Sequence, residues 1–372
     1  MEKDKSSKIK VLHLYSSFTS GGAEKRVISL AENLGKIGVY NLIGCPKGSY
    51  LEKEAIKLGL AVCPIIIHNS LDFIGILNLA KIVKMERIDI LHIHQGKIFW
   101  PSIFVKWLFF NKLKLVFHRR ADKKSSLLSR RHYKFADKII CVSKRVAENL
   151  IKFDKVEPLK ISVIYTGMEI DEDLYNGCKI RKEYNIEDKI VVGIVAGINK
   201  PEGKGQRYLL QAALFLKERY QNLHYLIVGD GSLKPELERY AYDMKIDDIV
   251  TFAGYRENVY DFIKAMDIVV LASCGTEALP GVLIEAHLLG KPVIGTDTGG
   301  ISETFIDGKT GFLIPSRDIE SLKRRLIELI EDESLRRKMG EAGKEFAKER
   351  FGVKNSCSEV KALYEALVND KN

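Results

Sequence analysis

The chain has 372 residues, 46% of them hydrophobic, and carries 59 Lys and Arg against 49 Asp and Glu, a formal net charge of +10. This composition excludes a disordered chain and a fibrous repeat. The length exceeds the roughly 250 to 300 residues that one core usually serves, so two domains are predicted.

Short strand-like runs alternate with helical periods through the first half of the chain. Strands are expected at residues 10–15, 40–45, 88–94, 115–118, 138–142 and 161–165, and a helix follows the first strand from Ala23. This βαβ rhythm predicts a parallel sheet with helices on both faces. Residues 165–175 contain a Gly and several acids without periodicity, which is typical of a linker.

The same rhythm restarts in the second half. Strands are expected at residues 189–197, 225–229, 249–253, 268–272 and 292–296, with helices at 206–219, 234–244 and 282–289. The predicted fold is therefore α/β, with two Rossmann-like, doubly wound parallel-sheet domains facing a cleft. In such sheets ligands bind beyond the carboxyl ends of the strands.

The excess positive charge lies entirely in the first domain. Residues 1–175 contain 30 basic and 18 acidic side chains, a balance of +12, whereas residues 176–372 contain 29 and 31, a balance of −2. A basic surface on one domain indicates an anionic partner, which could be nucleic acid, a membrane surface or an acidic substrate.

The cysteines and the apolar stretches indicate where the protein works. The six cysteines form no C-x-x-C pair, so neither a zinc site nor a disulfide framework is suggested. The amino terminus lacks the features of a signal peptide, and the longest apolar stretch, residues 98–110, falls short of the roughly 20 residues of a membrane span. We expect a cytoplasmic protein, with peripheral association with the inner face of the cell membrane left open.

Two glutamates flank the predicted start of a helix in the second domain. Glu277 lies in the loop after a strand, and Glu285 lies one turn into the helix. Free backbone N–H groups and the helix dipole at this end suit a phosphate, and the carboxylates can accept hydrogen bonds from sugar hydroxyls. On spacing alone, a capped and solvated helix end explains the pattern equally well.

The wider string from Glu277 to Glu303 closely resembles the E-x(7)-E signature of the retaining family-4 glycosyltransferases, which have the GT-B fold of two Rossmann-like domains. The resemblance covers almost the whole chain. It includes Gly21-Gly22-Ala-Glu24, Val228-Gly-Asp-Gly231, Thr251-Phe-Ala-Gly254, Ser273 and Gly308-Lys-Thr-Gly311-Phe-Leu-Ile-Pro315.

The resemblance implies roles for individual residues. It places Glu277 at the donor sugar, Glu285 at the ribose of the nucleotide, and His118, at the end of a first-domain strand, near the reaction centre. The family's basic clamp on the pyrophosphate falls on Lys204, but Ile198 stands where an arginine is expected. Whether Lys200 or Arg207 supplies the missing charge is open. The implied backbone contacts to the donor are at Gly21, Gly22, Pro280, Gly281, Val282 and Leu283.

The implied activity is retaining transfer of a hexosyl-type sugar from a nucleoside-diphosphate sugar, most often UDP, to a hydroxyl of a glycan or lipid-linked acceptor. Cell-envelope polysaccharide or lipopolysaccharide assembly is the expected setting. No cofactor and no metal are expected, because no acidic DxD-type clamp stands out and His92 and His94 show no third ligand with suitable spacing. The expected domains are residues 1–175 on the acceptor side, 176–350 on the nucleotide-sugar side, and a helix at 351–372 returning to the first domain.

Two alternative functions remain beside this hypothesis, a nicotinamide-dependent oxidoreductase and a nucleic-acid-binding module. A nicotinamide-dependent oxidoreductase is disfavoured because the stretch from Gly229 to Gly231 lacks the third glycine of G-x-G-x-x-G. The basic, apolar-rich region from residue 99 to 135 is compatible with a nucleic-acid-binding module, which we disfavour, with a solvated loop beside a core helix, or with a membrane or acceptor surface. The last hypothesis assigns Trp100, Trp107, Arg119, Arg120, Lys123, Lys124, Arg130 and Arg131 to that surface.

Overall fold

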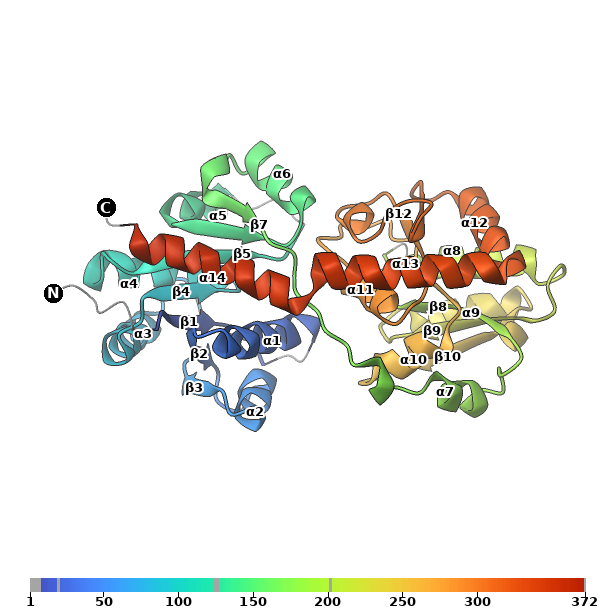
Figure 1. Cartoon of the computed structure of the whole chain (residues 1–372), viewed down its shortest axis with the longest axis horizontal. Coiled ribbons are helices and arrows are strands. Elements are labelled where there is room, and N and C mark those ends of the chain that lie inside the picture. The colour runs from blue at the N-terminus through green and yellow to red at the C-terminus, as the bar shows by residue number, and fades with distance from the viewer. Residues whose placement is uncertain (1–7, 19–20, 123–126, 201–202, 371–372) are drawn as a thin grey trace. The chain divides into compact units, whose positions relative to one another are not determined.

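The computed structural model describes residues 8–18, 21–122, 127–200 and 203–370 (Figure 1). Side chains are described for the same residues except 127–129. Lys123 and Lys124, which were expected on the basic surface, lie outside the described residues. The chain divides into two compact units. One comprises the residues up to Met168 together with those from Gly352 onward, and the other comprises Glu169–Phe351.

A seven-stranded parallel sheet forms the centre of the first unit, in the order β3-β2-β1-β4-β5-β6-β7. The central strands are continuous apolar runs, as expected for a parallel sheet buried on both faces. In register, Leu12 lies beside Leu42 on one side and Leu91 on the other. The strands are β1 (Lys10–Leu14), β2 (Tyr40–Cys45), β3 (Ala61–Pro64), β4 (Ile90–Ile93), β5 (Lys114–Arg119), β6 (Lys138–Cys141) and β7 (Ile161–Val163).

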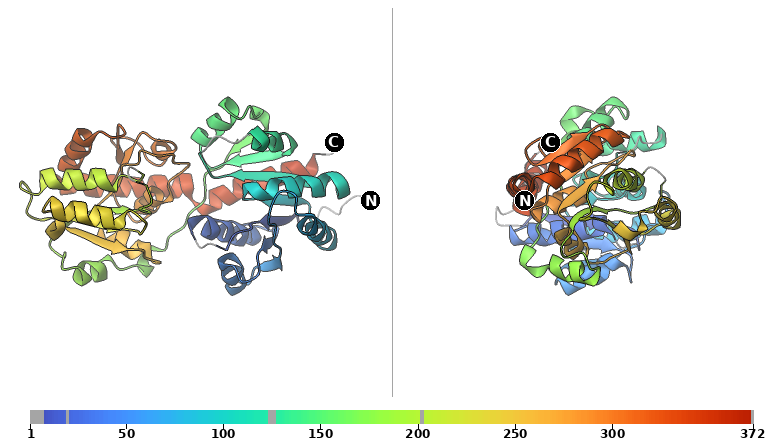
Figure 2. Two further views of the ribbon diagram at one scale, coloured as in Figure 1. Left: turned by 180° about the vertical axis from the view of Figure 1, so that it is seen from behind. Right: turned by 90° about the vertical axis from the view of Figure 1, so that its right-hand side faces the viewer.

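Helices cover this sheet, and one of them comes from the carboxy-terminal end of the chain. That helix, α14, packs on α1 and contributes Val360 and Tyr364 to a cluster that includes Val11 and Ile90 of the sheet. Figure 1 and the left view of Figure 2 show α14 running along the sheet. The helices of this unit are α1 (Gly22–Lys36), α2 (Tyr50–Lys57), α3 (Phe73–Glu86), α4 (Phe99–Phe109), α5 (Leu127–His132), α6 (Lys144–Lys152) and α14 (Val353–Asn369).

The second unit has a six-stranded parallel sheet in the order β10-β9-β8-β11-β12-β13. Successive side chains of β8 enter different clusters, Val191 one and Val192 the other, so a core lies on each face. The strands are β8 (Ile190–Val195), β9 (Leu223–Val228), β10 (Val250–Gly254), β11 (Ile268–Leu271), β12 (Val293–Thr296) and β13 (Gly311–Ile314). The helices are α7 (Gly177–Glu183), α8 (Gln206–Leu216), α9 (Lys234–Asp243), α10 (Val259–Ala265), α11 (Gly281–Leu288), α12 (Ile319–Glu331) and α13 (Glu333–Phe351).

The predicted α/β class with two doubly wound parallel sheets is confirmed. Two strands were not predicted, β3 and β13. Each is only four residues long and lies at an edge of its sheet, where a short run gives little periodic signal. Among the described helices, none combines the length and the apolar character needed to span a bilayer.

Candidate functional site

In the second unit, Glu277 of the loop between β11 and α11 forms an ion pair with Lys204, which lies just before α8. Lys204 Nζ lies 2.6 Å from Glu277 Oε1, and Ser273 Oγ lies 2.9 Å from the same oxygen. The Glu277 side chain is 7% exposed, whereas that of Lys204 is 38% exposed. A buried carboxylate needs such partners, because an unpaired charge in the interior is strongly destabilising. Lys204 therefore compensates the charge of Glu277 while its own side chain stays partly exposed.

Two glycines allow the backbone segments of this site to approach each other. Gly205 has φ +98°, and a Cβ there would lie 2.4 Å from the carbonyl oxygen of Ala272 at the end of β11. Gly299 has φ +60°, and a Cβ there would lie 2.0 Å from the carbonyl oxygen of Glu277. The next residue, Gly300, donates its N–H to that carbonyl at 2.8 Å. Any larger side chain at either position would displace the backbone that carries Lys204 or Glu277.

Helix α11 begins at Gly281 directly after this loop, with Pro280 as its N-cap. Pro280 offers no side-chain cap for the first turn. The unbonded N–H groups of a helix amino terminus attract anions, and Val282 and Leu283 lie in this turn. Glu285 follows on the same helix and is partly exposed. The predicted donor-site residues of the second unit thus meet around one loop and one helix start.

The residues around the position of the expected arginine differ in burial and in contacts. Ile198 is 2% exposed and belongs to the core of the second unit. Arg207 is held by Glu236, with 3.1 Å between Nη1 and Oε1, and lies over the ring of Tyr240. Lys200 is exposed on the loop after β8. Of the two proposed substitutes, Arg207 is in an ion pair, whereas Lys200 forms no ion pair with any described residue.

In the first unit, Gly21 and Gly22 lie where the chain enters α1. Gly22 is the first helical residue, and among the described residues a Cβ on it would meet nothing within 4 Å. Glu24, two residues later, is buried and accepts a hydrogen bond from the hydroxyl of Tyr15 at 2.9 Å. This bond ties the start of α1 to the carboxyl end of β1.

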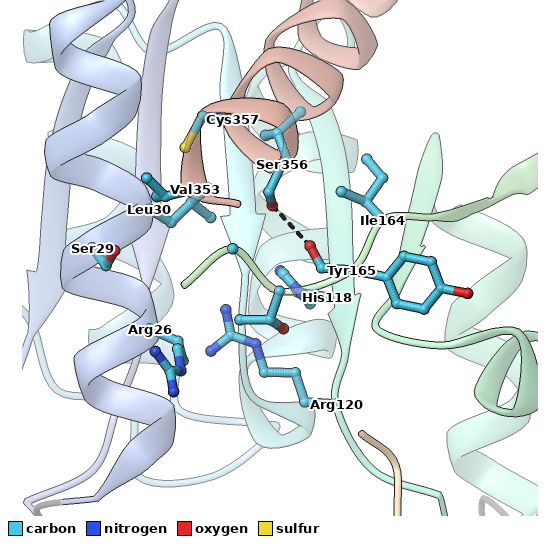
Figure 3. A pocket seen from close by; sticks show the side chains of 13 residues that line it. Arg26, Ser29, Leu30, His118, Arg120, Ile164, Tyr165, Val353, Ser356 and Cys357 are labelled. Carbon is cyan, nitrogen blue, oxygen red and sulfur yellow. Dashed lines mark hydrogen bonds between the residues drawn. The ribbon is translucent and has the colours of Figure 1, made fainter. Parts of the chain in front are cut away.

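His118, at the end of β5, lines a pocket in the first unit (Figure 3). Its side chain is 7% exposed, and its Nε2 has no hydrogen-bond partner within the described part of the chain. Arg26 and Ser29 of α1 and Arg120 line the same pocket, and the two guanidinium groups extend toward one another. Burial and the charge of Arg120 hold the pKa of His118 well below 6.5, so the ring is neutral. Burial also lowers the pKa of Arg120 to about 10, which leaves it charged.

His118 is one of four buried histidines whose rings lie side by side. The sequence indicated no third partner for His92 and His94, but β1 supplies one: ring nitrogens of His13, His92 and His94 all lie within 4.8 Å of one another. The rings of this cluster also form hydrogen bonds, between His13 Nδ1 and His94 Nε2 at 3.1 Å and between His92 Nε2 and His118 Nδ1 at 3.1 Å. His13 was missed because it lies 79 residues before His92, and only the pairing of β1 with β4 brings them together.

The residues expected on a basic, apolar surface differ in how exposed they are. Trp107 is 77% exposed at the end of α4, and Arg131 is exposed at the end of α5. Trp100 is partly buried and packs against other aromatic rings, including Phe104 and Phe135. The others have partners inside the unit: Arg130 Nε lies 3.3 Å from Asp154 Oδ1, and Arg120 Nη1 donates to the carbonyl of Ala23 at 3.1 Å. Arg119 is likewise only partly exposed.

Comparison with known proteins defines the class. The model of the family "Glycosyl transferases group 1" matches residues 178–346, and that of "Glycosyltransferase Family 4" matches residues 20–172. N-acetyl-alpha-D-glucosaminyl L-malate synthase of Bacillus anthracis is 30% identical over 311 residues, covering 79% of this chain and 79% of its own. The chain therefore belongs to the family-4 type of group 1 glycosyltransferases, and it is an enzyme of that class.

Two further comparisons extend this result. UDP-Gal:alpha-D-GlcNAc-diphosphoundecaprenol alpha-1,3-galactosyltransferase of Escherichia coli is 27% identical, with 81% of each chain covered. The Anabaena protein HepE, whose crystal structure was solved in complex with UDP, superposes with a TM-score of 0.84 at 22% identity, covering 96% of this chain and 100% of that one. The structural likeness confirms the GT-B fold.

Proposed function

We propose that this glycosyltransferase moves a hexosyl-type sugar, with retention of its anomeric configuration, from a UDP-sugar to a hydroxyl of a lipid-linked or glycan acceptor. The observation that carries the proposal is the Lys204–Glu277 pair beside the start of α11, because it combines a cation, a carboxylate and free backbone N–H groups. HepE binds UDP, and the Escherichia coli relative takes UDP-galactose to a diphosphoundecaprenol-linked sugar, which supports the choice of donor and acceptor.

The chemistry assigned to these residues follows from the charges that change. The bond between the anomeric carbon and the diphosphate oxygen breaks, the acceptor oxygen bonds to that carbon, and a diphosphate oxygen takes the acceptor proton. Negative charge grows on the leaving diphosphate, and donors placed beforehand lower the barrier. Lys204 and the first turn of α11 supply this stabilisation, so we propose that turnover needs no metal ion. Glu277 and Glu285 accept hydrogen bonds from the sugar and the ribose.

The assay that tests this proposal follows release of nucleoside diphosphate from UDP-glucose, UDP-galactose and UDP-N-acetylglucosamine, with an undecaprenyl-linked sugar as acceptor and with EDTA present. We expect turnover of at least one donor, no loss on chelation, and an α-linked product by proton NMR. A β-linked product would contradict retention, and a strict requirement for a divalent ion would contradict the role given to Lys204.

We also propose that helices α3 and α4 dock the first unit on an anionic lipid surface. These helices pack against each other and expose large apolar side chains. Residues 73–114 contain seven Lys and Arg against two Asp and Glu. Apolar side chains insert at an interface while each basic residue adds roughly 1 kcal/mol on anionic lipid. The exposed side chains are Phe73 (75%), Ile74 (75%), Leu77 (59%), Trp107 (77%), Leu108 (63%) and Phe109 (48%).

Replacing Trp107 and Leu108 together by serine is expected to reduce the protein bound to phosphatidylglycerol vesicles at least about tenfold, because burying each side chain contributes roughly 2 kcal/mol. Co-sedimentation at low and high salt measures this. The matched control is Phe215→Ser, which removes a 57% exposed apolar side chain from α8 of the other unit. Equal binding of both variants, or equal binding of the wild type to neutral vesicles, would exclude this docking surface.

A further inference from the structure

We propose that Tyr364 of the carboxy-terminal helix acts through His92 to fix the tautomer of His118, so that His118 presents an Nε2–H donor to the pocket of the first unit. Tyr364 and His92 are positioning residues in this proposal. The inference rests on the proposed function only for the statement that the substrate meets His118. The tautomer itself follows from the hydrogen bonds inside the first unit.

The three side chains form a continuous buried chain of hydrogen bonds. The hydroxyl of Tyr364 lies 2.5 Å from His92 Nδ1, and His92 Nε2 lies 3.1 Å from His118 Nδ1. The two imidazole planes are within 5° of each other, with centroids 5.2 Å apart, as an in-plane N–H···N bond requires. Tyr364 and His92 are both fully buried. Tyr364 and His92 are therefore out of contact with bulk solvent, and each has a hydrogen-bond partner inside the unit.

The direction of the chain follows from counting protons. The hydroxyl of Tyr364 has one hydrogen, and its one partner among the described side chains is His92 Nδ1. A buried O–H without an acceptor is unfavourable, so the hydroxyl donates to Nδ1. A neutral His92 then carries its proton on Nε2 and donates it to His118 Nδ1. A neutral His118 must carry its own proton on Nε2. The N–H that this arrangement leaves unpaired within the described residues is that of His118 Nε2, and His118 lines the pocket, where a ligand can accept it.

Neutrality of both rings is consistent with their surroundings. Burial, together with the neighbouring histidines and Arg120, holds the pKa of His92 well below 6.5, and the same holds for His118. An imidazolium in either position would place a further positive charge beside Arg120. The chain therefore transmits one defined arrangement of protons from α14 to the pocket.

A second chain in the same cluster has the opposite polarity. Asn41 Nδ2 donates to the carbonyl of Val39 at 3.0 Å, so its Oδ1 accepts from His13 Nε2 at 2.9 Å. His13 Nδ1 must then accept a hydrogen bond from the N–H of His94 Nε2. A neutral His94 therefore has no proton on Nδ1, so this nitrogen is an acceptor. The two series of hydrogen-bonded histidines thus end differently: one ends in a donor, His118 Nε2–H, and the other in an acceptor, His94 Nδ1. The partner at the start of each chain, Tyr364 or Asn41, decides the outcome.

The consequence for binding concerns the kind of ligand atom that fits. His118, Arg26 and Arg120 line the pocket, and the side chain of each can donate a hydrogen bond to a ligand there. Ligand atoms that meet them must be acceptors, such as a sugar hydroxyl oxygen, a carboxylate or a phosphate oxygen. In this tautomer His118 orients or polarises an oxygen and does not remove a proton from it.

The test is long-range proton–nitrogen NMR of the full chain labelled with 15N-histidine, with assignment by single histidine variants. We expect His92 and His118 each to show a protonated Nε2 and an unprotonated Nδ1, and His92 Nδ1 to show the shift of a hydrogen-bonded nitrogen. In Tyr364→Phe, that shift moves to the value of an unbonded nitrogen, and His118 becomes a mixture of tautomers. Loss of one transition-state hydrogen bond then lowers kcat about tenfold.

Tyr225→Phe is the matched control, because Tyr225 is also fully buried and its hydroxyl has no partner in the described part of the chain. This variant should leave the histidine spectra and kcat unchanged. A His118 protonated on Nδ1 in the wild type, unchanged His118 signals in Tyr364→Phe, or a stoichiometric metal ion on His92 would overturn the proposal. The wild-type spectrum gives its answer even if that variant fails to fold or no UDP-sugar is a substrate.

Discussion

Lys204→Met is expected to lower kcat/KM for sugar transfer by about 100-fold to 1,000-fold, the usual effect of removing one preorganised donor from a developing anion. Among the described residues, Lys204 is the cation that pairs with Glu277, with 2.6 Å between Nζ and Oε1, and its side chain is partly exposed. The same change leaves the Glu277 carboxylate buried without its counter-ion. Because the Lys204 side chain is 38% exposed, the cost is smaller than the roughly 3 to 5 kcal/mol of a fully buried pair, but the second unit should still unfold at a lower temperature.

The double variant Lys204→Met, Glu277→Gln separates these two effects. It removes both charges, so thermal stability should return to near the wild-type value while activity stays low. Lys217→Met is the matched control, because Lys217 pairs with Asp248 at 2.5 Å on the surface, where such pairs contribute roughly 0 to 1 kcal/mol. Steady-state kinetics and differential scanning calorimetry measure both quantities. Activity of Lys204→Met within a few fold of wild type would contradict the role of this lysine.

Acidification from about pH 7 to about pH 5 is expected to destabilise the first unit by several kcal/mol, because its buried histidines are neutral. Burial lowers the pKa of His13 to about 4 and that of His132 to about 3, against 6.5 in the unfolded chain. Since the folded pKa is depressed, the stability is complete above pH 6.5 and is lost as the pH falls toward the folded values. Each such histidine removes up to about 2 kcal/mol by pH 5.

The loss can be measured in this unit alone, because both tryptophans of the chain, Trp100 and Trp107, lie on its helix α4. Urea unfolding followed by tryptophan fluorescence at the two pH values gives the difference. His132→Phe should remove about 2 kcal/mol of it, since His132 lies among the rings of Phe99, Phe117 and Tyr133 and a phenyl ring does not titrate.

His68→Gln is the control for the histidine effect, because His68 is exposed and outside the buried cluster. Its pH dependence should match that of the wild type. An unfolding free energy that is unchanged between the two pH values, or an equal loss in His132→Phe and the wild type, would mean that these rings are not held neutral by the fold.

Much of this fold could be predicted because parallel strands buried on both faces are continuous apolar runs. The run at 268–272 gave β11 within one residue, and the acid-rich segment ending at residue 175 lies near the division at Met168. Short edge strands gave no such signal. Ala61–Pro64 has four residues, one of them proline, and is recognisable only from its pairing with β2.

For the candidate site, the sequence could nominate residues that are close together in one motif, but not contacts between residues that only the fold brings together. Glu277 and Glu285 could be read from one motif, but the bond between Glu277 and Lys204 joins residues 73 positions apart. The same holds for Tyr364 and His92, which are 272 positions apart. Spacing along a chain carries no information about such contacts, because they depend on strand order and on the return of α14 to the first sheet.

The most direct test of the donor assignment is a thermal-shift screen of the full chain against UDP-, GDP-, ADP- and dTDP-sugars, with NAD as the contrasting ligand. A ligand that binds only the folded state raises its stability, by roughly 2.7 kcal/mol at 100 times its Kd. We expect a UDP-sugar to raise the melting temperature of the wild type and to do so much less for Lys204→Met. A shift with NAD and none with any nucleotide sugar would contradict the proposed activity.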